Sequence, residues 1–112
     1  MIKQILFVVF LSCLISSYAQ PFLVSGKITD AKDNSGLIGV NVTLTDAKDS
    51  TRVYGASSDI DGSFIIPDVA AGEYVLNVSY ISYKTIVRNI SVTENTDLKN
   101  IPMAEESKLL KE

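Results

Sequence analysis

Two aspartates beside a glycine, in the run Ser58-Asp59-Ile60-Asp61-Gly62, are the clearest candidate for metal chemistry in this chain. Aspartates at alternate positions followed by glycine are typical of calcium-binding loops, in which a carboxylate closes the site at position twelve. Asp68 would occupy that position. However, position one would be a serine, and strand-forming residues flank the segment on both sides. The pattern therefore favours an ordinary turn, with calcium held by Asp59, Asp61 and Asp68 as the alternative.

The composition excludes most other chemistry. The chain has no histidine and a single cysteine, Cys13, so it lacks the residues for Ser-His-Asp and Cys-His catalysis and for histidine-ligated metals. The adjacent acids Glu105 and Glu106 have no pocket-forming residues around them in the sequence. We therefore expect no enzyme activity, no catalytic residue and no cofactor.

The tyrosines offer a different kind of site. Tyr74, Tyr80 and Tyr83 lie within ten residues, and an aromatic platform of that kind can bind sugars. However, Tyr74 and Tyr80 share the alternation of apolar side chains expected to fill the core, and the chain has no tryptophan. Core packing is the favoured interpretation, and glycan binding is the alternative.

The first 19 residues are typical of a secretory signal peptide. Lys3 precedes an apolar run from Ile5 to Ile15, and Ser17 and Ala19 form a small-x-small cleavage site. The run is shorter than the about 20 residues needed to span a bilayer. We expect export to the periplasm or outer membrane, with cleavage after Ala19. Lipidation of Cys13 is a weaker alternative, since the apolar run continues past it.

The remaining 93 of the 112 residues suffice for one small domain. Without Lys3 it has nine basic and 13 acidic residues and a net charge of about −4, and it has no basic cluster, so nucleic acid is not an expected partner. Runs of alternating or β-prone residues recur about every ten residues between turn signals. They fall near residues 22–29, 40–45, 51–56, 63–66, 73–80, 85–92 and 98–103.

This pattern predicts an all-β fold, a single seven-stranded antiparallel Greek-key sandwich over residues 20–103, with residues 104–112 as a linker. Arg88 falls on the same parity as neighbouring apolar residues, which indicates an edge strand or a bulge. The apolar parity of the strands gives the expected core: Val40, Val42, Leu44, Phe64, Tyr74, Leu76, Val78, Ile90 and Val92.

Several segments together resemble the carboxypeptidase regulatory-like domain, a transthyretin-like (prealbumin-like) β-sandwich. They are VSGKITD at 24–30, LIGVNV at 37–42, SDIDGSF at 58–64, AGEYVL at 71–76 and YISYK at 80–84. Their order and spacing agree with the family over nearly the whole chain after residue 19. The family usually has glycine where this chain has Ser82, so we expect a less extreme backbone angle there.

The residues that carry this resemblance have structural rather than reactive side chains. Gly26 would permit a bulge or close packing within its strand. Asp61 and Gly62 would form a tight hairpin that directs Phe64 into the core. Gly72 would let the chain re-enter the sheet before Tyr74. The expected structural motif is thus Gly26, Asp59, Asp61, Gly62, Phe64, Gly72 and Tyr74.

The resemblance implies a function in transport. In Bacteroidota such domains precede the plug and barrel of TonB-dependent outer-membrane receptors, and residues 104–112 resemble the stretch that leads into the plug. We therefore expect a non-catalytic periplasmic module for nutrient uptake, either a fragment or a stand-alone copy. Its partner would be the plug or barrel or a periplasmic protein, which could add a strand to a sheet edge. The alternatives are a secreted glycan- or peptide-binding module and a spacer domain beside a carboxypeptidase.

Overall fold

The computed structural model describes residues 21–106. The expected signal peptide and most of the expected linker therefore lie outside the described residues. The described part contains seven strands and no helix that could cross a membrane. The strands are β1 (Phe22–Asp30), β2 (Asn41–Asp46), β3 (Val53–Ser57), β4 (Ser63–Val69), β5 (Gly72–Ser79), β6 (Ile86–Val92) and β7 (Thr96–Met103).

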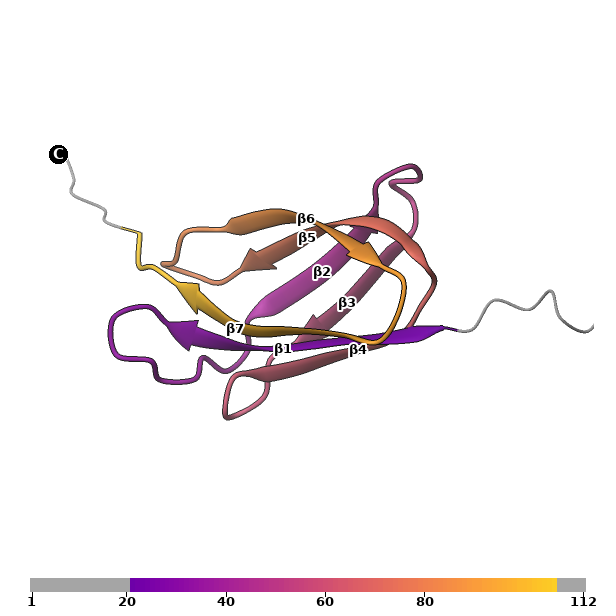
Figure 1. The fold of residues 1–112 in the computed structure, drawn as a ribbon. Helices are drawn as coiled ribbons and strands as arrows, with labels where there is room; N and C mark the ends of the chain where they lie inside the picture. Colours follow the sequence, from indigo (N-terminus) through magenta and orange to yellow (C-terminus); the bar gives the residue numbers. More distant parts are fainter. Residues whose placement is uncertain (1–20, 107–112) are drawn as a thin grey trace, which may run out of the picture.

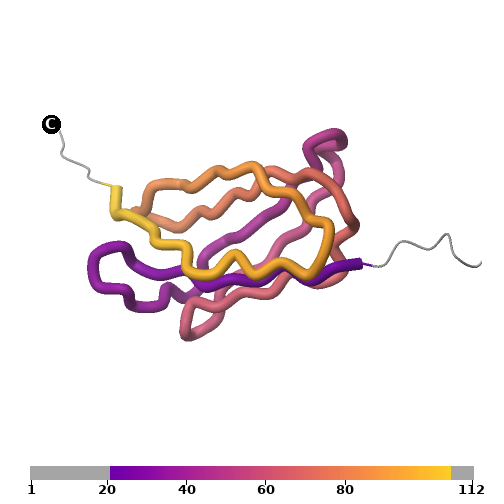
Figure 2. The backbone as a smooth tube through the Cα atoms, viewed as in Figure 1, coloured from indigo at the N-terminus to yellow at the C-terminus, as the bar shows by residue number. Residues whose placement is uncertain are grey.

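The strands form two sheets packed face to face, as Figures 1 and 2 show. One sheet has the order β4-β1-β7 and the other the order β3-β2-β5-β6. The chain crosses between the sheets after β1, β3, β4 and β6, in the Greek-key manner that the sequence predicts.

Two details of the prediction are wrong. The sandwich is not wholly antiparallel, because β1 and β7 pair in parallel. Each connection reverses the direction of the chain, so all odd-numbered strands run the same way. β1 and β7 are both odd-numbered, and as neighbours in one sheet they must therefore be parallel. In addition, residues 58–62 do not close a hairpin. They carry the chain from β3 in one sheet to β4 in the other.

The core lies between the two sheets and consists of apolar side chains, and Thr29 and Ser58 are the buried polar residues within residues 21–106. Eight of the nine expected core residues are buried, while Ile90 is half-buried on the edge strand β6. The three-stranded sheet contributes six further buried residues that the alternation did not single out: Val24, Ile28, Ile66, Val69, Ile101 and Met103. Arg88 is exposed on β6, which is an edge strand as its charge indicated.

Candidate functional site

The connection between β3 and β4 is held by its own aspartates. The Asp59 carboxylate accepts hydrogen bonds from the backbone N–H groups of Asp61 (3.3 Å) and Ser63 (3.1 Å). The Asp61 carboxylate accepts a second bond from the Ser63 N–H (3.0 Å). Hydrogen bonding to the Asp59 side chain and then to Ser63 lowers the pKa of Asp61 to about 2. Each carboxylate therefore uses its Oδ1 atom to organise the turn.

The third expected calcium ligand is elsewhere. Asp68 lies near the far end of β4, exposed and with a φ of 59°, so the strand carries it away from the turn at Asp59 and Asp61. Within residues 21–106 no three His, Cys, Asp or Glu side chains gather into a possible metal site. The structure thus brings together two of the three candidate ligands and separates the third.

Gly62 and Gly36 allow the turn to lie directly against the loop that follows β1. Gly62 has a φ of 90°, and a Cβ there would lie 2.3 Å from the Ile28 carbonyl oxygen. A Cβ on Gly36 would lie 2.1 Å from the Asp61 carbonyl oxygen. The backbones can approach this closely only because both residues lack a side chain. The Ile28 N–H completes the contact by donating to the Gly62 carbonyl (2.8 Å).

Ser58 joins the same two segments, and the sequence analysis missed this role. It is one of two buried polar residues among residues 21–106, with 4% of its surface exposed. Its hydroxyl accepts a hydrogen bond from the Val40 N–H (2.9 Å) and donates one to the Leu37 carbonyl (2.5 Å). The only sequence signal for this role was a polar residue directly before an Asp-x-Asp-Gly turn. That signal does not identify the hydrogen-bond partners of Ser58.

Gly26 and Phe64 occupy the positions that the motif predicts. A Cβ on Gly26 would lie 2.8 Å from Cε1 of the Phe64 ring, and the ring is buried. The β1–β7 register also shifts between Ser25 and Lys27, so Gly26 lies at a bulge. The close packing expected at Gly26 is mainly against the Phe64 side chain, because the nearest atoms belong to its ring rather than to a neighbouring backbone.

Tyr74 closes the turn between β4 and β5. Its hydroxyl donates a hydrogen bond to the Ala70 carbonyl (2.6 Å), and the Ala70 N–H donates to the Tyr54 hydroxyl (3.4 Å). The two rings meet edge to face, with centroids 5.8 Å apart. Burial, followed by the hydrogen bond with Tyr54, raises the pKa of Tyr74 to about 12. This arrangement resembles the tyrosine corner of immunoglobulin-like sandwiches. Gly72 begins β5 with no close contact.

The three tyrosines do not form one platform. Tyr74 is buried near the start of β5, whereas Tyr80 follows the end of that strand and Tyr83 lies in the next turn. The Tyr80 and Tyr83 rings are 5.6 Å apart and tilted by 37° to each other. Only these two could contact a ligand together.

Tyr83 also ties the turn to β1. Its hydroxyl donates a 2.6 Å hydrogen bond to the Asp30 carboxylate. This bond is the largest cause that lowers the pKa of Asp30 and raises the pKa of Tyr83 to about 12. Ser82, beside it, has a φ of 71°, so the expectation of a less extreme backbone angle is wrong. The serine adopts the left-handed conformation that glycine would adopt at no steric cost.

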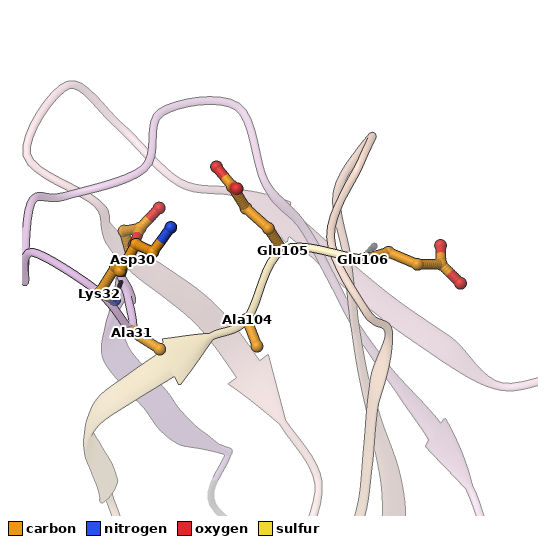
Figure 3. A pocket seen from close by; sticks show the side chains of 6 residues that line it. All are labelled: Asp30, Ala31, Lys32, Ala104, Glu105 and Glu106. Atoms are coloured by element: carbon orange, nitrogen blue, oxygen red, sulfur yellow. Dashed lines mark hydrogen bonds between the residues drawn. The ribbon is translucent and has the colours of Figure 1, made fainter. Parts of the chain in front are cut away.

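A hollow lies where the chain leaves β7 (Figure 3). It has a volume of about 490 Å³ and is lined by Asp30, Ala31, Lys32, Ala104, Glu105 and Glu106. Residues 104–106 pair with the turn that carries Tyr83, through the bonds Lys84 N–H to Ala104 carbonyl and Glu106 N–H to Ser82 carbonyl (both 2.9 Å). Glu106 points away from Asp30 and Lys32. The hollow holds opposite charges and no buried polar group, so nothing in it selects a substrate.

A sequence-family model matches the part of the chain that forms the two-sheet sandwich. The model of the CarboxypepD_reg-like domain matches residues 24–112. The chain belongs to this family. The match covers most of the chain, including all of the segments that hold the described sandwich together. A comparison with curated proteins gives no match.

Solved structures with similar folds include chains of a cohesin–dockerin complex and of pilins. A chain of a type II cohesin–X-dockerin complex from Acetivibrio cellulolyticus is 27% identical, with a TM-score of 0.62 over 75% of this chain and 58% of that chain. The shaft pilin SpaA from Lactobacillus rhamnosus GG is 12% identical, with a TM-score of 0.63 over 80% of this chain and 48% of that chain. The similarity to the pilin shows only that the two proteins share a fold. This CarboxypepD_reg-like domain spans less than two thirds of either chain.

Proposed function

We propose that this domain is an exported, non-catalytic module of a TonB-dependent outer-membrane receptor system, in which it docks to a protein partner. The observation that carries the proposal is the family match over residues 24–112 on a sandwich whose motif residues are all structural. The signal-peptide pattern of residues 1–19 supports export.

The way in which the polar side chains are used supports a non-catalytic role. Asp59 and Asp61 bind the backbone of their own turn, and Ser58 bridges two loops. The Asp30 and Tyr83 side chains bind each other. Catalysis needs a reactive group that is free to meet a substrate, and these groups are engaged in holding the fold.

The sheet edges argue against docking by strand addition. The edge strands β4 and β7 each contain a proline and a non-glycine residue with positive φ: Pro67 and Asp68 in β4, Pro102 and Lys99 in β7. β3 has only five residues, and β6 carries Arg88 on its core-facing parity. Proline, short strands and inward charges are the devices by which natural sheets block edge pairing. Partner contact through other surfaces is therefore favoured.

A secreted glycan-binding module is the second candidate. The observation that favours it is the Tyr80 and Tyr83 pair, because Tyr80 also lines a smaller hollow with Gly39, Asn41, Ser79 and Ile81. Aromatic rings beside amide and hydroxyl groups can bind sugars, but two tilted rings make a small platform.

Fractionation of the native host tests the two candidates. We expect the exported chain to sediment with the outer membrane and to be isolated together with a TonB-dependent receptor after mild detergent extraction. A chain found free in the medium, binding one sugar on a glycan array at micromolar affinity, would contradict the receptor proposal. A Y80A variant separates specific from adventitious sugar binding, since only the former should be lost.

A further inference from the structure

One end of the sandwich carries three exposed isoleucines on three different loops. Ile38 follows β1, Ile60 lies in the turn between β3 and β4, and Ile81 lies in the turn between β5 and β6. Their exposed fractions are 54%, 84% and 84%. In Figure 1 the loop after β1 and the turn between β5 and β6 lie at the left, and the turn between β3 and β4 lies at the lower left; we call this end of the sandwich the isoleucine end.

The three loops are held in a fixed arrangement. The Gly39 N–H donates to the Ser58 carbonyl (2.9 Å), so the loop of Ile38 is bonded to the turn of Ile60. On its other side, Gly39 lines the same hollow as Tyr80 and Ile81. The isoleucines are thus presented on a preformed surface, which reduces the entropy lost when a partner binds.

The opposite end of the molecule provides an internal comparison. Its loops are residues 47–52, 70–71 and 93–95, and they consist of alanine and polar or charged residues only. The exposed large apolar residues nearest that end, Leu23 (40%) and Val53 (53%), lie within strands β1 and β3 rather than at loop tips. Single exposed apolar residues are common on protein surfaces, whereas the three large apolar loop tips among residues 21–106 all lie at the isoleucine end. A concentration of apolar side chains at one place indicates an interaction site.

The charges around the isoleucine end are mainly acidic. Asp59 and Asp61 flank Ile60 directly, and the low pKa of Asp61 keeps its carboxylate charged at neutral pH. The loops and strand ends at this end carry six acidic residues and two lysines: Asp30, Asp33, Asp59, Asp61, Glu105, Glu106, Lys32 and Lys84. Lys27 in β1 adds a third positive charge close enough to act on Asp61. An acidic ring repels an anionic lipid surface and also a second copy of itself.

We infer that the isoleucine end is a docking surface for a protein whose matching patch is apolar at its centre and bordered by lysine and arginine. The apolar tips supply the buried contact, and the acidic ring supplies charge complementarity with that partner. The inference adds a docking surface to the proposed function. It rests on the proposed function only for the cellular location in which the partner is found.

Site-specific photo-cross-linking in the native host tests this inference. A photoreactive phenylalanine analogue replaces Ile60 or Ile81 in the full chain, and matched probes replace Ile65 or Val87. These control residues are 58% and 61% exposed but lie on the two sheet faces. We expect Ile60 and Ile81 probes to capture the same protein at least tenfold more efficiently than the control probes. The captured peptide should contain apolar residues beside lysine or arginine.

Substitutions check the same surface without the probe chemistry. With the probe at Ile38, the double variant I60S/I81S should reduce capture at least tenfold, while I65S/V87S should leave it within twofold. Both pairs of residues are exposed, so both variants should keep the urea midpoint of the parent chain. Raising the salt concentration to about 0.5 M should also weaken capture, because it screens the acidic ring.

The outcomes separate the inference from the proposed function. Capture of a TonB-dependent receptor from Ile60 and Ile81 supports both, and capture of a different protein from those positions supports the inference and contradicts the receptor proposal. Capture of the receptor only from Ile65 or Val87 overturns the inference and leaves the proposed function. Cross-linked dimers, no capture, or I60S/I81S-sensitive binding to phosphatidylethanolamine–phosphatidylglycerol vesicles would each overturn it.

Discussion

The hydroxyl of Tyr83 donates a 2.6 Å hydrogen bond to the carboxylate of Asp30, 53 positions earlier in the chain. This bond joins the end of β1 to the turn between β5 and β6, and so links the two sheets at the isoleucine end. It also couples the ionisation of both residues to the stability of the fold.

Replacing Tyr83 with phenylalanine should remove a pH-dependent part of the stability. The folded-state pKa of Asp30 lies below its usual value of 3.8, so the stabilising contribution is fully present above that pH and is lost as pH falls through the folded pKa. The pKa of Tyr83 is raised to about 12, so the contribution is also lost as pH rises from 10 through 12. Urea unfolding should show Y83F less stable than the parent at pH 7, with a difference that becomes smaller as the pH falls below 3.8.

A direct titration separates this bond from a loss of packing. In Y83F the carboxyl carbon resonance of Asp30 should titrate closer to 3.8 than in the parent chain, while that of Asp49 should not change. An unchanged Asp30 titration would contradict the proposed coupling.

Replacing Gly26 with alanine should destabilise the domain by about 1–3 kcal/mol, as overpacking in a core does. The added methyl would lie 2.8 Å from the Phe64 ring, which cannot move freely because it is buried. Gly72→Ala is the matched control, since its nearest atom would lie at an ordinary 3.8 Å. Equal unfolding free energies for the two variants would show that ring contact is not the reason for Gly26.

Replacing Gly62 with alanine should cost more than replacing Gly39, although both have positive φ. Gly39→Ala meets backbone strain of about 1–2 kcal/mol and no close atom. Gly62→Ala adds a contact of 2.3 Å with the Ile28 carbonyl oxygen, and we expect a total of about 3 kcal/mol or more. Chemical denaturation of both variants measures the difference, and a G62A cost no larger than that of G39A would refute the close approach of the two loops.

Replacing Ser58 with alanine should cost about 1–3 kcal/mol, because it leaves the Val40 N–H and the Leu37 carbonyl without their partner. Ser57 is exposed and adjacent, so Ser57→Ala is the control and should change stability by less than about 0.5 kcal/mol. Hydrogen exchange at the Val40 amide provides a local readout. It should become faster in S58A and remain protected in S57A.

The sequence was most informative where one face of a strand is buried. Val40, Val42 and Leu44 in and before β2, and Tyr74, Leu76 and Val78 in β5, follow a strict alternation, and all are buried. β1 was harder to interpret because apolar Leu23 lies on its exposed side and Gly26, which has no side chain, lies between Val24 and Ile28 on its buried side. The apolar–polar alternation that includes Val24 and Ile28 is therefore weak in the sequence.

Contacts between segments that are distant in the chain could not be predicted from the local sequence pattern. An Asp-Gly turn looks the same whether it closes a hairpin or crosses between sheets, so the destination of residues 58–62 was mispredicted. The parallel pairing of β1 with β7 likewise depends on which strands become neighbours. Three loops meet at one end of the folded domain. Only this arrangement reveals the roles of Ser58 and of the apolar tips Ile38, Ile60 and Ile81.

The parallel pairing of β1 and β7 gives the domain a mechanical property. The chain enters β1 at one end of the sandwich and leaves β7 at the other (Figure 2). A pulling force applied between residues 21 and 106 would therefore act along these two neighbouring strands in opposite directions. Their ladder would be loaded in shear, so its hydrogen bonds would bear the tension together rather than open one after another.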